Sequence, residues 1–228
     1  MASIIRLENI EKVYGEKVKT QVLFDVNLTF EEGSFNGIIG QSGSGKSTLL
    51  NIVGTLDKPT AGEVYISDVR TDIMNSAQLA ELRNRTIGFI FQSHYLLPEF
   101  TAKENILMPH RIKSFKITKE VDEWADELLE LTGLTKVKNN LATDMSGGQQ
   151  QRTAIARALI NKPAIILADE PTGNLESDTS EIIYNLLRDI NQRYNTTFII
   201  ITHDQRIAEK TDRIVEILDG RINLDAIR

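Results

Sequence analysis

Alternating hydrophobic and polar residues mark the first predicted strands of the chain. Hydrophobic side chains at every second position of residues 24–30 form the pattern of a strand with one buried face. A similar stretch begins at Ile5, and another lies around Val64. Turn-forming residues at 15–17 and 31–33 separate these stretches. The N-terminal third is therefore expected to be rich in β-structure.

A helical periodicity replaces this pattern from residue 92 to about residue 163. Thr101 and Glu104 fit a capping box, in which each side chain satisfies a free amide at a helix start. Within residues 121–128, hydrophobic side chains recur at i, i+3, i+4 and i+7, which predicts an amphipathic helix that ends near Gly133. The opposite face is acidic and is expected to be solvated. Its residues are Glu120, Asp122, Glu123, Asp126 and Glu127.

The last third alternates between strand and helix patterns. Residues 164–168 and 198–201 are short, continuous hydrophobic runs, as expected for strands buried on both faces of a parallel sheet. Between them, residues 182–190 carry a hydrophobic stripe at helical spacing. Asp219 and Gly220 separate two further hydrophobic runs and predict a hairpin.

Length and composition limit the class of protein. The 228 residues, 41% hydrophobic and 25% charged, fit one domain with a buried core. We expect a single domain over 1–228, with the core and β subdomain at about 1–91 and 164–228 and a helical subdomain inserted at about 92–163. No hydrophobic stretch approaches the roughly 18 residues of a membrane-spanning helix. The absence of cysteine excludes disulfides and thiolate metal sites, and the net charge of −6 argues against a general nucleic-acid binder.

Residues 40–47 fit the phosphate-binding pattern G-x-x-x-x-G-K-[ST]. A predicted strand at 35–39 precedes them and a predicted helix at 47–56 follows, which is the context that such a loop requires. Glycines let the backbone amides turn inward around phosphate oxygens, and the helix N-terminus adds positive partial charge. Lys46 would neutralise the β- and γ-phosphates, and the Ser47 hydroxyl would bind Mg²⁺.

Two acidic residues follow the hydrophobic run that ends at Ala168. Asp169 stands at the carboxyl end of this strand, where α/β sheets bind ligands, and is predicted to hold Mg²⁺. Glu170 comes next and is predicted to act as the base, or to polarise the water, that attacks the γ-phosphate. An acidic pair alone is a weak signal, and the phosphate-binding loop makes it a strong one.

Three single residues are weaker candidates for the same site. Gln92 follows the hydrophobic run 87–91, so it lies beyond a strand end and could reach Mg²⁺ or the attacking water. His203 follows residues 198–201 in the same way and could donate to a γ-phosphate oxygen. Tyr14 could stack on a nucleotide base. Taken singly, each has an ordinary structural alternative.

A second glycine-rich segment opens a predicted helix at residues 146–149, Ser-Gly-Gly-Gln. Ser146 is a natural helix cap, and the helix start is also a potential anion-binding terminus. The residues alone do not decide between these two interpretations.

In chain order, these motifs resemble those of the ATP-binding cassette ATPases, the motor subunits of ABC transporters. The resemblance spans residues 4–223 and implies a P-loop NTPase (RecA-like) α/β core with an N-terminal antiparallel β subdomain and an inserted α-helical subdomain. It implies that ATP and Mg²⁺ are the cofactors. It assigns catalysis to Lys46, Gln92, Glu170 and His203, and Mg²⁺ binding to Ser47, Gln92 and Asp169. The implied nucleotide-binding residues are Tyr14, Gly40, Gln41, Ser42, Gly43, Ser44, Gly45, Lys46, Ser47, Thr48, Ser146, Gly147, Gly148 and Gln149.

The resemblance also implies a mode of action. Two subunits would close head-to-tail on two ATP molecules and drive a separate membrane permease from the cytoplasmic face of the membrane, with no nucleic-acid partner. The motifs are most similar to the macrolide-exporter and lipoprotein-release branch, so export or extraction of lipoprotein, peptide or lipophilic cargo is expected. Glu176 stands where the family has Asp in the loop between the two ATP sites. The alternatives are a signalling module like those of cell division, a soluble ATPase of DNA repair or translation, and a catalytically dead binding module, which the intact motifs disfavour.

Overall fold

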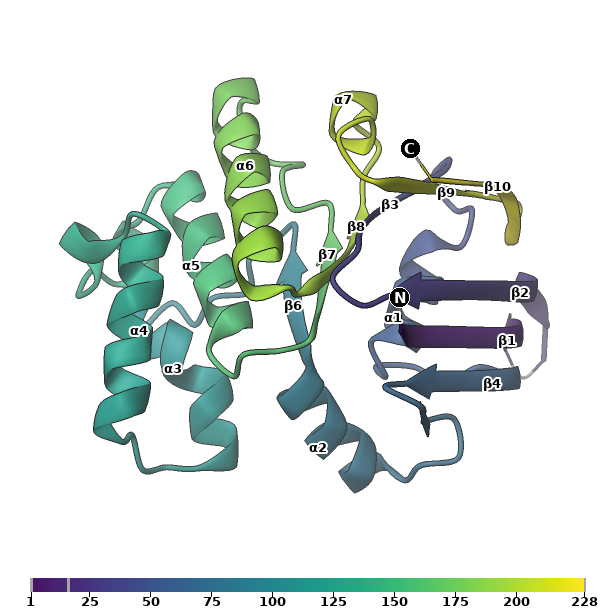
Figure 1. Cartoon of the computed structure of the whole chain (residues 1–228), viewed down its shortest axis with the longest axis horizontal. Coiled ribbons are helices and arrows are strands. Elements are labelled where there is room, and N and C mark those ends of the chain that lie inside the picture. The colour runs from purple at the N-terminus through teal and green to yellow at the C-terminus, as the bar shows by residue number, and fades with distance from the viewer. Residues whose placement is uncertain (1, 16, 228) are drawn as a thin grey trace.

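The computed structural model describes residues 2–15 and 17–227, which form two β-sheets and the helices that cover them (Figure 1). The first sheet is antiparallel, with strand order β2-β1-β4-β5. Its strands are β1 (Ser3–Tyr14), β2 (Thr20–Glu31), β4 (Ala61–Ile66) and β5 (Val69–Arg70). The predicted N-terminal strands are confirmed. The predicted turn at 15–17 includes residue 16, which lies outside the described residues.

The second sheet is the central one, with strand order β10-β9-β3-β8-β7-β6. The strands from β9 to β6 run parallel, and β10 is antiparallel to β9. The hairpin predicted at Asp219 and Gly220 is therefore confirmed. The strands are β3 (Phe35–Ile39), β6 (Ile87–Phe91), β7 (Ile165–Asp169), β8 (Thr197–Ile201), β9 (Arg213–Leu218) and β10 (Arg221–Ile227).

Several of the helices begin at residues whose side chains cap them. Thr101 and Glu104 form the predicted capping box, and Thr118 caps the amphipathic helix that follows. The helix predicted over residues 47–56 is shorter, because Gly54 ends it. The helices are α1 (Lys46–Val53), α2 (Ser76–Thr86), α3 (Ala102–Lys113), α4 (Lys119–Leu131), α5 (Gly147–Leu159), α6 (Ser177–Tyr194) and α7 (Gln205–Ala208), with 3-10 turns at Thr135–Val137 and Ala142–Asp144.

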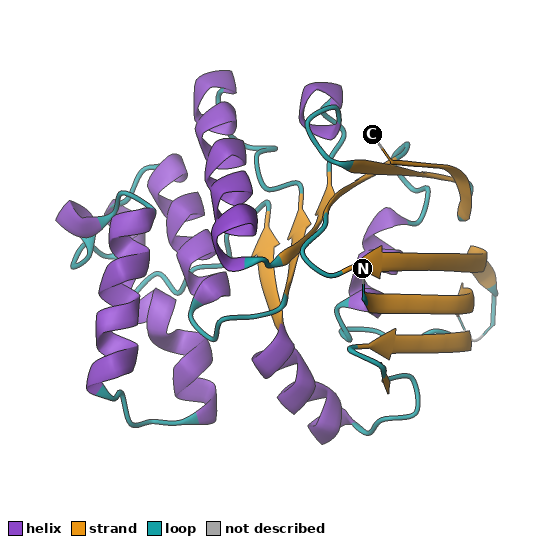
Figure 2. Ribbon diagram, viewed as in Figure 1, coloured by secondary structure: helices purple, strands orange, loops and turns teal. Residues whose placement is uncertain are grey.

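In Figure 2, the antiparallel sheet and most of the helices lie on opposite sides of the parallel strands. A hydrophobic cluster on each face of this central sheet holds the layers together. Alternate residues of β7 serve both: Ile165 joins the cluster that contains α1 and the antiparallel sheet, and Ile166 joins the cluster that contains α3–α6. Helix α1 thus lies on the opposite face of the central sheet from α5. The cluster that contains residues of α3–α5 also includes residues of α6 and of the central sheet. The subdomain boundaries at 92 and 163 stay a prediction.

The structure corrects one detail of the helical lobe. On the acidic face of α4, Glu120, Glu123 and Glu127 are exposed as predicted. Asp122 and Asp126, however, pair with Lys103 of α3, and Asp126 also pairs with Lys138. The periodicity of α4 by itself gives no information about a neighbouring helix. Such half-exposed ion pairs contribute only about 0–1 kcal/mol each to the stability of the fold. Their main effect is to hold α3 and α4 side by side.

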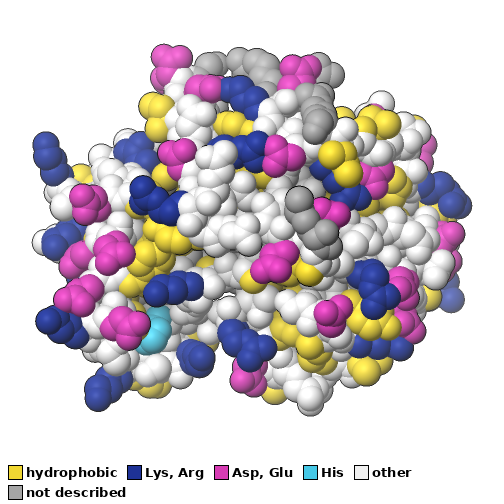
Figure 3. Space-filling model, viewed as in Figure 1, with side chains coloured by type: hydrophobic (Ala, Val, Ile, Leu, Met, Phe, Trp, Pro, Cys, Tyr) yellow, Lys and Arg dark blue, Asp and Glu magenta, His cyan; other side chains and the backbone are white. Residues whose placement is uncertain are grey.

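The surface mixes charges of both signs. Figure 3 shows Lys and Arg side chains interspersed with Asp and Glu over the viewed face. Within the described residues, no helix is both long and hydrophobic enough to cross a membrane.

Candidate active site

The register of the central sheet brings four predicted site loops to one edge. Phe91 of β6 pairs with Asp169 of β7, and Asp169 pairs with Ile201 of β8. Ile38 of β3 pairs with the same Ile201. Because these strands are parallel, the loops that follow them leave the sheet together at its carboxyl edge. These loops carry Gly40, Gln92, Glu170 and His203.

The phosphate-binding loop depends on glycine for its path. Gly40, Gly43 and Gly45 have φ values of 147°, 79° and 105°, in the region that side-chain-bearing residues avoid. A Cβ atom on Gly40 would also stand 2.2 Å from the carbonyl oxygen of Ile217. The loop is therefore closed by backbone that only glycine can adopt, and it leads directly into α1.

The Lys46 ammonium is held inside this loop. Its Nζ donates to the carbonyl oxygens of Gly40 at 2.8 Å and Gln41 at 2.6 Å, and the residue is 8% exposed. Burial lowers the pKa of Lys46, while the nearby Glu170 and Asp169 carboxylates act to raise it. The loop therefore presents a partly desolvated cation that lacks a direct carboxylate partner among the described residues, as a phosphate-binding lysine requires.

Asp169 and Ser47 form a pair of oxygen donors next to Lys46. The two side chains share a hydrogen bond that acts to lower the pKa of Asp169, but burial, and then Glu170, raise that pKa above its usual value. Within the described residues, no group of three or more His, Cys, Asp or Glu side chains is arranged so that it could hold a metal ion by itself. One carboxylate and one hydroxyl fit Mg²⁺ that takes its other ligands from water and phosphate.

Glu170 and His203 face each other across the same edge. His203 Nδ1 lies 2.7 Å from Glu170 Oε2. Glu170 itself has a φ of 47°, a left-handed conformation that costs a residue with a side chain about 1–2 kcal/mol. The two residues line a cavity of about 180 Å³ with Thr172, Gly173, Ser180 and Thr202. This cavity is large enough for water beside the carboxylate.

Gln92 lies next to Glu170 but is bonded elsewhere. Its Nε2 donates to Asn174 Oδ1 at 3.0 Å, and Asn174 Nδ2 donates back to the Gln92 carbonyl at 3.2 Å. A Cβ atom on Gly173 would stand 2.7 Å from Gln92 Nε2 and 3.1 Å from Glu170 Oε2. Gly173 thus lets Gln92 and Glu170 approach, and in the part of the chain described no hydrogen bond joins Gln92 to Ser47 or Asp169. Sequence reasoning gave no role to Asn174, because its partner is 82 residues away.

Tyr14 lies beside the phosphate-binding loop. A side-chain hydrogen bond joins it to Thr48, and its hydroxyl donates to Asp57 Oδ2 at 2.8 Å. Lys12 Nζ lies 2.6 Å from Asp57 Oδ1 and 4.7 Å from the centre of the Tyr14 ring. Tyr14 is 40% exposed, so its ring is oriented by Asp57 and Lys12 while remaining accessible to a base. The sequence indicated Tyr14 but not Asp57, which no local pattern connects to it.

The second glycine-rich segment is a helix cap. Ser146 Oγ accepts from the Gln149 amide at 3.4 Å, and Gln149 Oε1 accepts from the Ser146 amide at 2.9 Å. Gly147 and Gly148 follow at the start of α5, on the opposite face of the central sheet from α1. No hydrogen bond or ion pair among residues 2–15 and 17–227 joins this segment to residues 40–48. The structure therefore leaves residues 146–149 apart from the loop site of their own chain.

A phosphate-binding loop at one edge of a parallel sheet, with a carboxylate pair and a histidine beside it, defines a P-loop ATPase. The chain matches the family model described as "ABC transporter" over residues 23–173. It is 47% identical to the lipoprotein-releasing system ATP-binding protein LolD 1 of Rhodopseudomonas palustris, covering 97% of this chain and 99% of that protein. It is also 47% identical to the lipoprotein-releasing system ATP-binding protein LolD of Anaeromyxobacter dehalogenans, covering 97% of this chain and 93% of that one.

Among solved structures, the chain resembles the ATP-binding cassette MJ0796 in a dimeric post-hydrolysis state bound to ADP and Pi. The TM-score is 0.90 at 42% identity, and the match covers 98% of both chains. The chain therefore belongs to the ABC transporter family, and it is an ATP-binding, ATP-hydrolysing subunit of that family.

Proposed function

We propose that this ATPase drives a lipoprotein-releasing transporter, at the cytoplasmic face of the membrane, through a separate membrane permease. The similarity over the whole length to ATP-binding proteins of lipoprotein-releasing systems carries this proposal. The signalling alternative lacks such support. The cargo contacts would lie in the permease.

The site residues divide the hydrolytic work among them. Lys46 binds the β- and γ-phosphates of ATP. Ser47 and Asp169 would hold Mg²⁺, and Gln92 would join them once it is released from Asn174. Bound Mg²⁺ supplies Lewis-acid polarisation of the phosphate oxygens. Glu170 accepts the proton of the attacking water on its carboxylate, and His203 gives up its hydrogen bond to that carboxylate to donate to a γ-phosphate oxygen instead.

Two copies of the chain are proposed to close head-to-tail on two ATP molecules. The separation of residues 146–149 from residues 40–48 supports this arrangement, because the amides at the start of α5 then face the ATP of the partner subunit. The dimeric state of the solved cassette MJ0796 is in keeping with it. ATP would then bridge the subunits, and hydrolysis would remove the bridge.

Glu176 offers a test of the loop between the two ATP sites. It is the N-cap residue of α6 but makes no side-chain cap hydrogen bond, whereas Asp is a preferred N-cap. Glu176→Asp is expected to stabilise the nucleotide-free chain by about 0.5–1 kcal/mol, which raises the melting temperature by about 1–4 °C. It is also expected to change the cooperativity of ATP hydrolysis without abolishing turnover. An unchanged Hill coefficient and turnover would contradict the role of Glu176 in the dimer.

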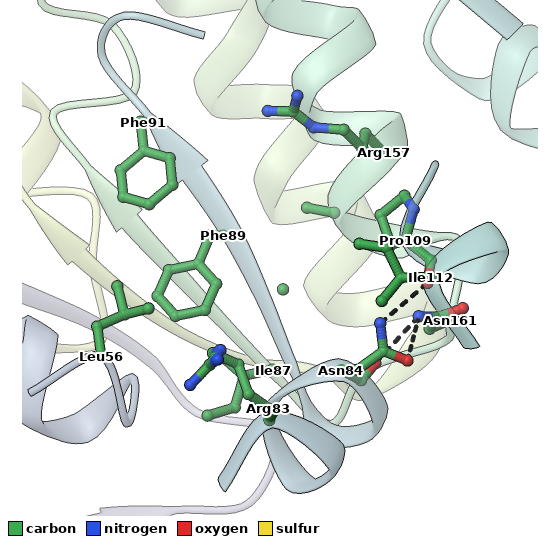
Figure 4. Close-up of a pocket in the computed structure, with 13 residues that line it drawn as sticks. Leu56, Arg83, Asn84, Ile87, Phe89, Phe91, Pro109, Ile112, Arg157 and Asn161 are labelled. Atoms are coloured by element: carbon green, nitrogen blue, oxygen red, sulfur yellow. Dashed lines mark hydrogen bonds between the residues drawn. The ribbon is translucent and has the colours of Figure 1, made fainter. Parts of the chain in front are cut away.

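An exposed hydrophobic groove is the proposed docking site of the permease (Figure 4). It lies between α2, α3, α5 and β6, has a volume of about 370 Å³, and has Phe89 and Phe91 stacked on its floor, with ring centres 5.6 Å apart. Asn84 of α2 donates to the carbonyl of Pro109 in α3 and accepts from Asn161, which lies in the turn after α5, so these bonds connect the segments around the groove. Exposed Leu56 and Ile112 suit the hydrophobic face of an amphipathic helix.

Two substitutions of Tyr14 distinguish base stacking from hydrogen bonding as contributions to ATP binding. Tyr14→Ala is expected to weaken ATP binding about tenfold, because base stacking on an aromatic ring contributes about 1–3 kcal/mol. Tyr14→Phe keeps the ring, loses the hydroxyl's bonds to Asp57 and Thr48, and is expected to weaken binding less than about threefold. Titration with a fluorescent ATP analogue measures both. Equal losses in the two variants would show that the ring does not stack.

The proposed cargo is tested on the assembled transporter. The tagged chain is purified with its permease from the membranes of its own host and reconstituted into liposomes that contain an acylated lipoprotein. ATP-dependent transfer of the lipoprotein to a soluble acceptor is expected. ATP hydrolysis by the complex without any transfer would favour the signalling alternative.

A further inference from the structure

The backbone immediately after Gln92 is held in an unfavourable conformation. His94 and Tyr95 have φ values of 55° and 47°, so two consecutive residues with side chains are left-handed. Such residues persist only where their surroundings hold them. The Tyr95 ring contacts Phe91 edge-on, with ring centres 5.3 Å apart, but this contact fixes a side chain and not the peptide groups.

Arg157 of α5 binds the peptide groups of this turn. Its Nη2 donates to the His94 carbonyl and its Nη1 donates to the Tyr95 carbonyl, both at 2.6 Å. No ion pair joins Arg157 to a carboxylate within residues 2–15 and 17–227, and burial lowers its pKa. A desolvated guanidinium without an acidic partner is costly unless its hydrogen bonds are well made, so the two carbonyl bonds account for the presence of arginine here.

We propose that Arg157 is a positioning residue for catalysis, which fixes the turn at His94 and Tyr95 and thereby the place of Gln92 beside Glu170. The inference rests on the role proposed for Gln92 in ATP hydrolysis. It adds a residue that acts on Gln92 only through the backbone of the turn. A planar fork suits this task, because it holds two adjacent carbonyls at once.

Helix α5 connects this turn to the rest of the site. Gln151 donates to the carbonyl of Pro171, next to Glu170, and Gln150 makes a side-chain hydrogen bond with His94. One helix thus holds the loop of Gln92 and the loop of Glu170, and residues 146–149 lie at its start.

Arg157 also lines the proposed permease groove. Figure 4 shows its guanidinium extending from α5 toward the end of β6 that carries Phe91. A helix that enters the groove therefore contacts the stem of the residue that holds the turn. Groove occupation and the position of Gln92 are linked through this one side chain.

The test compares Arg157→Met with the wild type in the purified complex with permease. Met keeps much of the hydrophobic stem and removes the donors. The maximal rate of ATP hydrolysis is expected to fall about tenfold, while KM for ATP changes less than about twofold because Lys46 and Tyr14 are untouched. Arg157→Lys keeps a charge but not the fork, and an intermediate rate is expected.

A double variant that adds His94→Gly to Arg157→Met distinguishes the proposed role from a role in packing. If Arg157 only fills space, His94→Gly is not expected to restore the rate. Glycine adopts a positive φ without strain, so the turn depends less on Arg157. The double variant is expected to hydrolyse ATP about threefold faster than Arg157→Met alone. If it is no faster, or if Arg157→Met hydrolyses ATP at the wild-type rate, the inference is wrong.

Arg188→Met controls for the loss of a half-buried arginine. Arg188 binds Asp212 and stacks on Phe35, away from the site. It is expected to lower the melting temperature but to leave the rate per bound ATP unchanged. If the rate of ATP hydrolysis in Arg157→Met falls only in proportion to the fraction of protein that is folded, Arg157 has a structural role and the inference is wrong. If Arg157→Met does not fold, the same comparison is made with Arg157→Lys. Inactivity of the wild-type complex would instead count against the proposed function.

Discussion

Replacing Glu170 with glutamine is expected to lower ATP turnover at least about 100-fold, because a positioned general base contributes about 10²–10⁴-fold. Glutamine has nearly the same shape and its oxygen can still face His203, but it cannot take the proton of the attacking water. ATP binding is expected to persist, since Lys46 and Tyr14 are unchanged. Steady-state phosphate release and ATP titration measure the two effects.

The same variant tests the proposed dimer. Because Glu170→Gln binds ATP without cleaving it, Mg-ATP is expected to shift the chain from monomer to dimer in size-exclusion chromatography. Glu120→Gln, the same substitution on the exposed face of α4, serves as the control and is expected to hydrolyse ATP normally. Normal hydrolysis by Glu170→Gln would remove Glu170 from its catalytic role.

Replacing Lys46 with alanine is expected to weaken ATP binding about 100-fold, which corresponds to about 2.7 kcal/mol. A hydrogen bond to a charged group contributes about 1.5–3 kcal/mol, and Lys46 would meet two phosphates. The substitution also removes the two bonds that brace the loop at Gly40 and Gln41. ATP titration by calorimetry measures the loss.

An exposed lysine provides the matched control. Lys58 donates to the carbonyls of Asp72 and Met74 on the surface and lies outside the loop site. Lys58→Ala is expected to bind ATP with wild-type affinity. If both variants bind equally, Lys46 does not contact the phosphates.

The hydrophobic pattern predicted those strands and helices in which the hydrophobic positions are also the buried ones. The alternation over residues 24–30 became β2, with Val26, Leu28 and Phe30 buried. Helix α2 was missed because most of its residues are polar and only Leu79, Leu82 and Thr86 are buried. Its one local signal is the capping box of Asn75 and Gln78, which the pattern of hydrophobic residues does not contain.

A hydrophobic stripe at helical spacing can include residues that stay exposed in the structure. The stripe over residues 182–190 became α6, but Ile182 is 55% exposed while the adjacent Ile183 is buried. Neighbouring helical residues point about 100° apart, so one side of a broad stripe faces away from the sheet. The sequence gives the width of the stripe, and only packing selects the buried part.

The sequence by itself determined the chemistry of this ATPase: the glycines and Lys46 of the loop, the Asp169 and Glu170 pair, and their places at strand ends. These are local properties, fixed by residue type and by the strand or helix alongside. Tertiary structure decided which residues meet: Gln92 with Asn174, Tyr14 with Asp57, and Arg157 with the turn after Gln92. Such contacts join residues between 43 and 82 positions apart, and they depend on strand order and helix packing, which no local pattern contains.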